Sequence, residues 1–290
     1  MFALLIGVLG LVVGTALALI AERVPDNGGG GRSPRHCRTC ETELPARSLA
    51  PVRSAATACS NCGTPVPASR LPTVLTTAVV FALTAGVIGS RWQLIPVLLF
   101  ASSLIALSVV DIVRYRLPDR LTFPAFGVSI VLIAVLSTTG GAGDHVLRAL
   151  VTALGYAGIM LIFNIIMPSG LAFGDVKLSL LLGLFLGWVA DSSIDAARLV
   201  IWALLLGMVL GIVSGILVGV GRRVYGNGFL PDPDFPPPED GSVLPLLKTA
   251  FPFGPALAIS AFSLVLLSDC LLYTSPSPRD QRGSRMPSSA

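Results

Sequence analysis

The sequence predicts an all-α, polytopic membrane protein, and composition is the first reason. Hydrophobic residues make up 53% of the 290 residues and charged residues only 12%, with a mean hydropathy of +0.80. Soluble domains carry about 25% charged residues, so composition argues against a soluble globular fold, a disordered chain and a coiled coil. The formal net charge of +4 is too small and too scattered to indicate nucleic-acid binding.

Eight apolar stretches are the second reason, since a helix needs about 20 apolar residues to span a bilayer. None alternates polar and apolar residues as a barrel strand would. The second and sixth are short. The first lacks the basic start and the cleavage site of a removed signal peptide, so it is expected to be a retained anchor. The expected segments are 2–21, 72–88, 93–113, 121–138, 146–167, 177–190, 199–220 and 250–269.

The distribution of Lys and Arg predicts the orientation. The loops after the first, third, fifth and seventh segments hold fourteen of these residues and the other three loops hold three, when Lys177 and Arg148 at the segment ends are counted with the adjoining loops. Loops rich in Lys and Arg stay in the cytoplasm, so the odd-numbered loops are expected there and the N-terminus outside.

Four regions follow from these patterns: an anchor at 1–21, a cytoplasmic loop at 22–71, a transmembrane core at 72–269 and a disordered tail at 270–290. The tail places three arginines on the expected outer side and has no apolar periodicity. Its last part, 274–290, looks like vector or adapter sequence and is left out of the functional argument.

Two C-x-x-C pairs separated by eighteen residues lie in the cytoplasmic loop. Four thiolates at this spacing fill the tetrahedral coordination of zinc and leave no position for water, so the pattern predicts a structural site. Two disulfides are the alternative, which a reducing cytoplasm disfavours. His36, beside Cys37, is an alternative to one of the cysteines as a ligand. Cys270 lies near the tail and belongs to neither pair. The expected ligands are Cys37, Cys40, Cys59 and Cys62.

Asp111 and Asp175 lie where apolar segments meet one membrane face. Ionisable residues at this depth are costly and therefore candidates for function. Asp111 ends the third segment and Asp175 opens the sixth, so both belong at the cytoplasmic level. Two facing carboxyls cannot both ionise, and a shared proton lets one accept a proton from water while the other donates. The alternative is that each caps a helix or pairs with a nearby Arg or Lys.

Other chemistries have little support. The chain has two histidines, and it lacks H-E-x-x-H, G-x-S-x-G and the phosphate-binding G-x-x-x-x-G-K-[ST]. A carboxylate-lined transporter or a zinc-stabilised membrane scaffold is the rival hypothesis. Transporter sites lie near the bilayer midplane, whereas both aspartates are expected near one face.

Four features together resemble the type IV prepilin peptidases, which belong to the G-x-G-D intramembrane aspartyl proteases. They are the anchor with its cysteine loop, D-I-x-x-x-x-L-P-D-x-L-T at 111–122, F-G-D-V-K-L at 173–178 and P-F-G-P-A-L at 252–257. The resemblance runs from about residue 5 to 267.

This resemblance implies cleavage of the leader of prepilins and pseudopilins after a glycine, at the cytoplasmic face of the bacterial inner membrane. It maps the catalytic pair onto Asp111 and Asp175. It also implies, for forms with a cysteine loop, methylation of the new N-terminus with S-adenosylmethionine, which the cysteines alone do not establish. The chain departs from the family in having Ala172 where the motif has glycine.

Five further residues are expected to support the site. Gly174 allows close backbone approach or an unusual backbone angle, or packs as a small residue against another helix. Lys177 interacts with Asp175 or extends toward lipid headgroups. Phe253, Gly254 and Pro255 are expected to kink a helix near the site, or to serve packing alone. Asp119 is expected to cap a helix, with Pro118 setting the turn.

Overall fold

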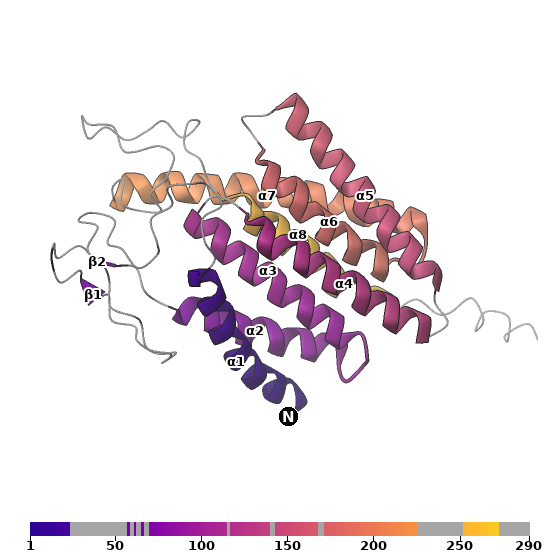
Figure 1. Cartoon of the computed structure of the whole chain (residues 1–290). Helices are drawn as coiled ribbons and strands as arrows, with labels where there is room; N and C mark the ends of the chain where they lie inside the picture. Colours follow the sequence, from indigo (N-terminus) through magenta and orange to yellow (C-terminus); the bar gives the residue numbers. More distant parts are fainter. Residues whose placement is uncertain are drawn as a thin grey trace, which may run out of the picture.

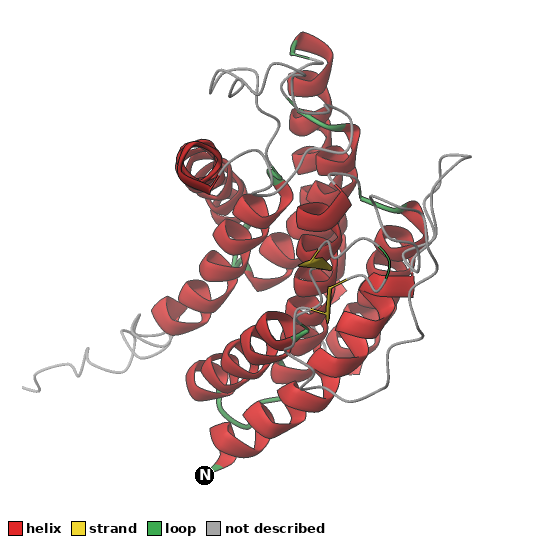
Figure 2. Ribbon diagram, turned by 90° about the vertical axis from the view of Figure 1, so that its left-hand side faces the viewer, coloured by secondary structure: helices red, strands yellow, loops and turns green. Residues whose placement is uncertain are grey.

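A computed structural model of the chain describes residues 1–23, 57–58, 61, 65–66, 70–114, 117–139, 143–167, 171–225 and 252–272. These residues form eight α-helices and one pair of short antiparallel strands, in which Thr57 of β1 (Thr57–Ala58) lies opposite Val66 of β2 (Pro65–Val66) (Figures 1 and 2). The expected zinc ligands Cys37, Cys40, Cys59 and Cys62 lie outside the described residues.

All eight helices coincide with expected apolar stretches. They are α1 (Phe2–Arg23), α2 (Leu71–Ile88), α3 (Leu94–Arg114), α4 (Asp119–Thr139), α5 (Gly143–Ile166), α6 (Phe173–Val189), α7 (Ser193–Tyr225) and α8 (Gly254–Leu272). Six of them, α1 to α5 and α7, are long and apolar enough to cross a membrane. The all-α, polytopic prediction is therefore confirmed with six candidate spans. Helix α6 has 17 residues and α8 is apolar over Gly254–Ser268, so eight spans stay a prediction.

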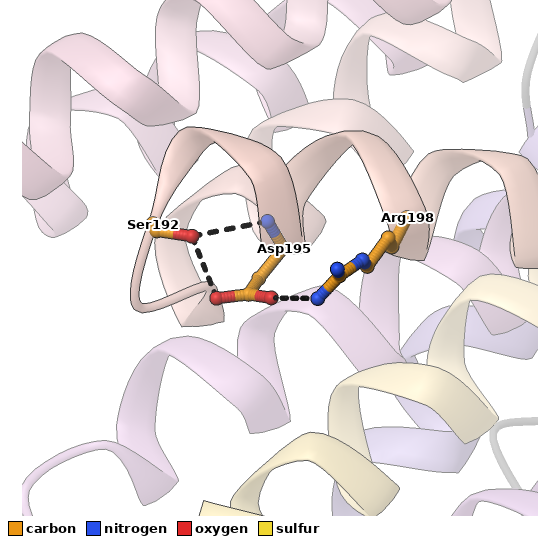
Figure 3. A network of polar contacts seen from close by, with 3 residues as sticks. All are labelled: Ser192, Asp195 and Arg198. Carbon is orange, nitrogen blue, oxygen red and sulfur yellow. Dashed lines mark hydrogen bonds and ion pairs between the residues drawn. The ribbon is translucent and has the colours of Figure 1, made fainter.

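Several boundaries differ from the prediction by a few residues, and two of them change how a region is assigned. Helix α8 continues to Leu272, although the tail was expected to begin at residue 270. Helix α7 begins at Ser193 instead of residue 199, because a polar cap precedes its apolar part. The Ser192 hydroxyl accepts the Asp195 N–H at 3.2 Å and donates to Asp195 Oδ2 at 2.6 Å, and Arg198 binds Oδ1 at 3.1 Å (Figure 3). Such a cap satisfies main-chain groups that would otherwise lack partners at a helix start.

Glycines let several neighbouring helices pack closely. A Cβ at Gly183 of α6 would lie 2.8 Å from Ala153 Cα of α5, and one at Gly187 would lie 2.6 Å from Thr152 Cβ. Gly10 of α1 similarly leaves no room for a Cβ beside Ala78 of α2. Small residues at such contacts are typical of membrane helices, where packing rather than the hydrophobic effect holds helices together.

The interior of the bundle surrounds α6, which packs against α4, α5, α7 and α8. The rings of Phe100 on α3 and Phe185 on α6 stack with centroids 4.1 Å apart. Apolar side chains on the outer helix faces are exposed, as in Val128 on α4 and Leu154 on α5. These exposed apolar faces are suited to contact with lipid rather than with water.

The chain direction brings the helix termini that carry the candidate residues to one end of the bundle. Helix α3 ends there, and α4, α6 and α8 begin there, while α7 continues past them toward the left of Figure 1. At the opposite end, Arg148 of α5 donates to the carbonyl of Gly187 in α6 at 3.2 Å. It also donates to the carbonyl of Asp191, just after α6, at 3.1 Å. These bonds fix α6 lengthwise against α5, and with it the level at which α6 begins.

Candidate active site

Asp111 lies in the last turn of α3 and is 5% exposed. Its Oδ2 accepts a hydrogen bond of 3.0 Å from the main-chain N–H of Gly254, the first residue of α8. The free N–H groups at a helix start carry partial positive charge, so this contact suits a carboxylate oxygen. A Cβ at Gly254 would lie 2.7 Å from Oδ2, so the contact requires glycine.

Asp175 lies in the first turn of α6 and is 3% exposed. Its carboxyl is close enough to that of Asp111 for the two to interact electrostatically. The main-chain N–H of Asp175 donates to the Ala172 carbonyl at 3.0 Å. Asn164 of α5 donates to the Leu171 carbonyl at 2.6 Å, which fixes the segment just before α6. The fold therefore brings together the two aspartates that the sequence singled out.

The backbone before Asp175 explains how the chain tolerates Ala172. This residue is exposed and has φ −73° and ψ 144°, an extended conformation that alanine adopts without strain. Gly174 has a packing role: a Cβ there would lie 2.9 Å from Leu117 Cδ1, in the turn that follows α3. Among the described glycines, Gly89 is the one with positive φ. The expectation of an unusual backbone angle at Gly174 is therefore wrong, and close packing is the reason for the glycine.

Lys177 forms an ion pair that the sequence did not predict. Its Nζ forms an ion pair with Asp119 Oδ1 at the start of α4. The ammonium also lies over the rings of Phe173 and Phe123, 5.0 and 5.8 Å from their centroids. The ion-pair partner of Lys177 is thus Asp119 and not the expected Asp175, and its extension toward lipid headgroups stays a prediction. The reason is that α4 and α6 begin side by side, which places Asp119 within reach of Lys177.

The segment Phe253, Gly254 and Pro255 begins α8 instead of kinking it, which corrects the expected kink. The Phe253 carbonyl accepts the N–H groups of Ala256 and Leu257 at 3.1 and 3.3 Å, as the residue before a helix does. Proline fits the first turn because its missing N–H has no partner in the helix there. This helix start is what presents the Gly254 N–H to Asp111.

Three residues near this site were not predicted. Leu117 fills the space beside Gly174, and Gly211 of α7 faces the ring of Phe253. Tyr156 of α5 is fully buried and within electrostatic range of Asp175, and its hydroxyl has no hydrogen-bond partner in the described part of the chain. Glycine, leucine and tyrosine are common in membrane helices, so no sequence pattern distinguishes these three.

The arrangement places two buried carboxyls, one of them bound by a main-chain N–H, at the end of a helix bundle. Within the described residues, no group of three or more His, Cys, Asp or Glu side chains gathers as a metal site would. A pair of interacting carboxyls is suited to transferring protons to and from a bound substrate.

These features define a polytopic helical membrane protein with an aspartate pair at one end of the bundle. The chain belongs to the type IV prepilin peptidase family. The model of the type IV leader peptidase family matches residues 98–219, and that of the bacterial peptidase A24 N-terminal domain matches residues 8–88.

Several relatives carry the name prepilin leader peptidase/N-methyltransferase. The protein from Myxococcus xanthus is 29% identical over 66% of this chain and 58% of its own length. The protein from Aeromonas hydrophila is 32% identical over 46% of this chain and 46% of its own length. The protein from Dichelobacter nodosus is 30% identical over 52% of this chain and 54% of its own length. The chain thus spans about half the length of these relatives. No solved structure matches it.

Proposed function

We propose that this protein is a prepilin leader peptidase, a membrane aspartyl endopeptidase that removes the leader of prepilins and pseudopilins after a glycine. The observation that carries the proposal is the burial of Asp111 and Asp175 at the same end of the bundle, within electrostatic range of each other. Both belong to the motifs that resemble the family, and the family-model match at 98–219 includes both. The names of the relatives support the same activity.

The proposed chemistry assigns all proton transfers to the two carboxyls. Burial of both makes double ionisation costly, so the pair shares one proton. The ionised carboxylate takes a proton from water, which attacks the scissile carbonyl carbon. The protonated partner donates its proton to the carbonyl oxygen. As the intermediate collapses, the carboxyl that took the proton from water gives it to the leaving amine, and a hydroxyl of the intermediate returns a proton to the other carboxylate. The hydrogen bond from Gly254 holds the orientation of the Asp111 carboxyl.

We propose the cytoplasmic face of the bacterial inner membrane as the location of the site. The loops expected on that side hold fourteen Lys and Arg residues against three in the remaining loops. A prepilin has a basic leader before an apolar helix, so its cleavage point stops at the cytoplasmic interface by the same charge rule. In this proposal α6 and α8 complete the set of eight membrane segments, with substrate and lipid as the partners.

The cytoplasmic loop is proposed to bind a structural zinc ion through Cys37, Cys40, Cys59 and Cys62. The donor set fits zinc, because four thiolates complete its tetrahedral shell. Methyl transfer from S-adenosylmethionine to the new N-terminus is proposed as well. The names of the relatives and the cysteine loop support it, and no residue of this chain is assigned to it.

Coexpression with a candidate prepilin, followed by mass analysis of the pilin N-terminus, tests both activities together. We expect loss of the leader and, where methyl transfer occurs, an added methyl group. Asp111→Asn or Asp175→Asn should each abolish cleavage, because an amide cannot hold or accept the shared proton. The matched control is Asp191→Asn, an exposed residue beyond α6 at the opposite end. Full cleavage by either variant of the pair would refute the proposed mechanism.

A further inference from the structure

Helix α7 carries a notch at Gly211 that the ring of Phe253 occupies. A Cβ at Gly211 would lie 2.2 Å from Phe253 Cε2 and 2.7 Å from Cδ2. No side chain packs at such distances, so the ring sits where any residue larger than glycine would place atoms. Glycine lowers helix stability by roughly 1 kcal/mol relative to alanine, so helix propensity does not explain a glycine at this position. The physical reason for the glycine is the space that it leaves for the ring.

Phe253 is directly joined to the residue that binds Asp111. Its carbonyl begins the hydrogen bonding of α8, and the next N–H, that of Gly254, donates to Asp111 Oδ2 at 3.0 Å. Pro252 and Pro255 flank the pair and restrict its backbone, since proline fixes φ. A shift of the ring is therefore transmitted to the Gly254 N–H instead of being absorbed by a flexible loop.

We infer that Gly211 is a positioning residue for Asp111. The notch on α7 seats Phe253, Phe253 places Gly254 at the start of α8, and Gly254 orients the carboxyl on α3. The role of Asp111 in cleavage comes from the proposed function, on which this inference rests. The link among the three helices is a property of the fold and can be tested separately.

Gly207 provides a matched control one turn earlier on the same helix. A Cβ there would also meet α8, 2.8 Å from Leu257 Cδ2 and 3.2 Å from Ser260 Oγ. The nearest atom is the end of a flexible side chain, and the backbone group that binds Asp111 belongs to Gly254 instead. Gly207→Ala and Gly211→Ala thus make the same chemical change at the same pair of helices, and only the second displaces Phe253.

The first measurement is the steady-state kinetics of prepilin cleavage. We expect Gly211→Ala to lower kcat roughly 100-fold, the cost of a misplacement of about 1 Å, with little change in KM. Gly207→Ala should stay near the wild-type kcat. Phe253→Ala added to Gly211→Ala removes the clashing ring atoms and should recover part of the lost rate. Equal kcat values for the two glycine variants would overturn the inference.

The second measurement does not depend on activity. Within residues 252–255, Phe253 and Gly254 are the two residues that carry an amide hydrogen, because the other two are proline. Hydrogen exchange of this segment in the full-length protein should accelerate in Gly211→Ala and in Asp111→Ala, and stay slow in Gly207→Ala. Unchanged exchange in Gly211→Ala would overturn the inference. If the wild-type protein does not cleave prepilin but the variants show the expected exchange pattern, the proposed function is refuted and the link between Gly211 and Asp111 stands.

Discussion

The main-chain N–H of Gly254 donates to Oδ2 of Asp111 across 143 residues of sequence. The bond joins the first residue of α8 to the last turn of α3 and leaves no room for a side chain, because a Cβ would lie 2.7 Å from the oxygen. The orientation of the Asp111 carboxyl therefore depends on a backbone group at the start of α8.

Gly254→Ala should impair cleavage while the protein stays folded. The added methyl group pushes against the Asp111 carboxyl and displaces it, so kcat is expected to fall roughly 100-fold. Kinetics on a prepilin and a thermal unfolding curve in detergent would check both parts. Gly158→Ala on α5 is the control, because a Cβ at Gly158 meets nothing within 4 Å. Wild-type kinetics for Gly254→Ala would contradict this reading of the contact.

Asp119→Asn should leave cleavage nearly intact, unlike substitution of the buried pair. The Asp119 side chain is 48% exposed and its Lys177 partner 20% exposed, and such partly exposed ion pairs contribute about 0–1 kcal/mol to stability. A double-mutant cycle with Lys177→Met, measured by thermal unfolding, gives the coupling between them. Loss of cleavage in folded Asp119→Asn protein would assign this residue a role in the reaction that we do not expect.

Gly183→Leu should destabilise the protein by about 1–3 kcal/mol or more through overpacking. A side chain there meets the backbone of α5, with Ala153 Cα and the Thr152 carbonyl oxygen each 2.8 Å from the Cβ, so a rotamer change gives no relief. Gly155→Ala on α5, where the Cβ position is open, should be neutral or stabilising. Thermal unfolding in one detergent compares the two, and equal midpoints would argue against the tight α5–α6 contact.

Purified protein is expected to contain about one zinc ion per chain, bound by four cysteines. Cys40→Ser should lower the zinc content, whereas Cys270→Ser should leave it unchanged, because Cys270 lies outside the paired spacing. Metal analysis and thiol titration on the same samples decide between the alternatives. Absence of both zinc and free thiols would favour two disulfides.

Much of the fold could be predicted because membrane insertion depends on local composition. Each of the eight apolar stretches forms a helix, since a buried or lipid-facing backbone must satisfy its own hydrogen bonds. The start of α7 was missed because its first turn is polar and held by the Ser192 cap, which hydropathy does not detect. The two aspartates were found because charge inside an apolar segment is costly and therefore rare.

The supporting contacts were predicted less well, since they depend on which helices are neighbours. Lys177 was expected to interact with Asp175, which is close to it in the sequence, yet its ion-pair partner is Asp119 of α4. Gly174 was expected to allow a close backbone approach or an unusual backbone angle, or to serve packing, and the nearness of Leu117 favours packing. Phe253, Gly254 and Pro255 were correctly expected near the site, but their hydrogen-bonding role became visible only with α8 set against α3.

The sequence by itself determined the helices, the class of membrane protein and the two aspartates, because hydropathy and the cost of buried charge act on local segments. Only the tertiary structure decided that Asp111 meets Gly254, that Lys177 pairs with Asp119 and that Phe253 sits in the notch at Gly211. These contacts join helices far apart in the chain. They arise from the fit of small and large side chains between helices, which the order of residues along one helix does not specify.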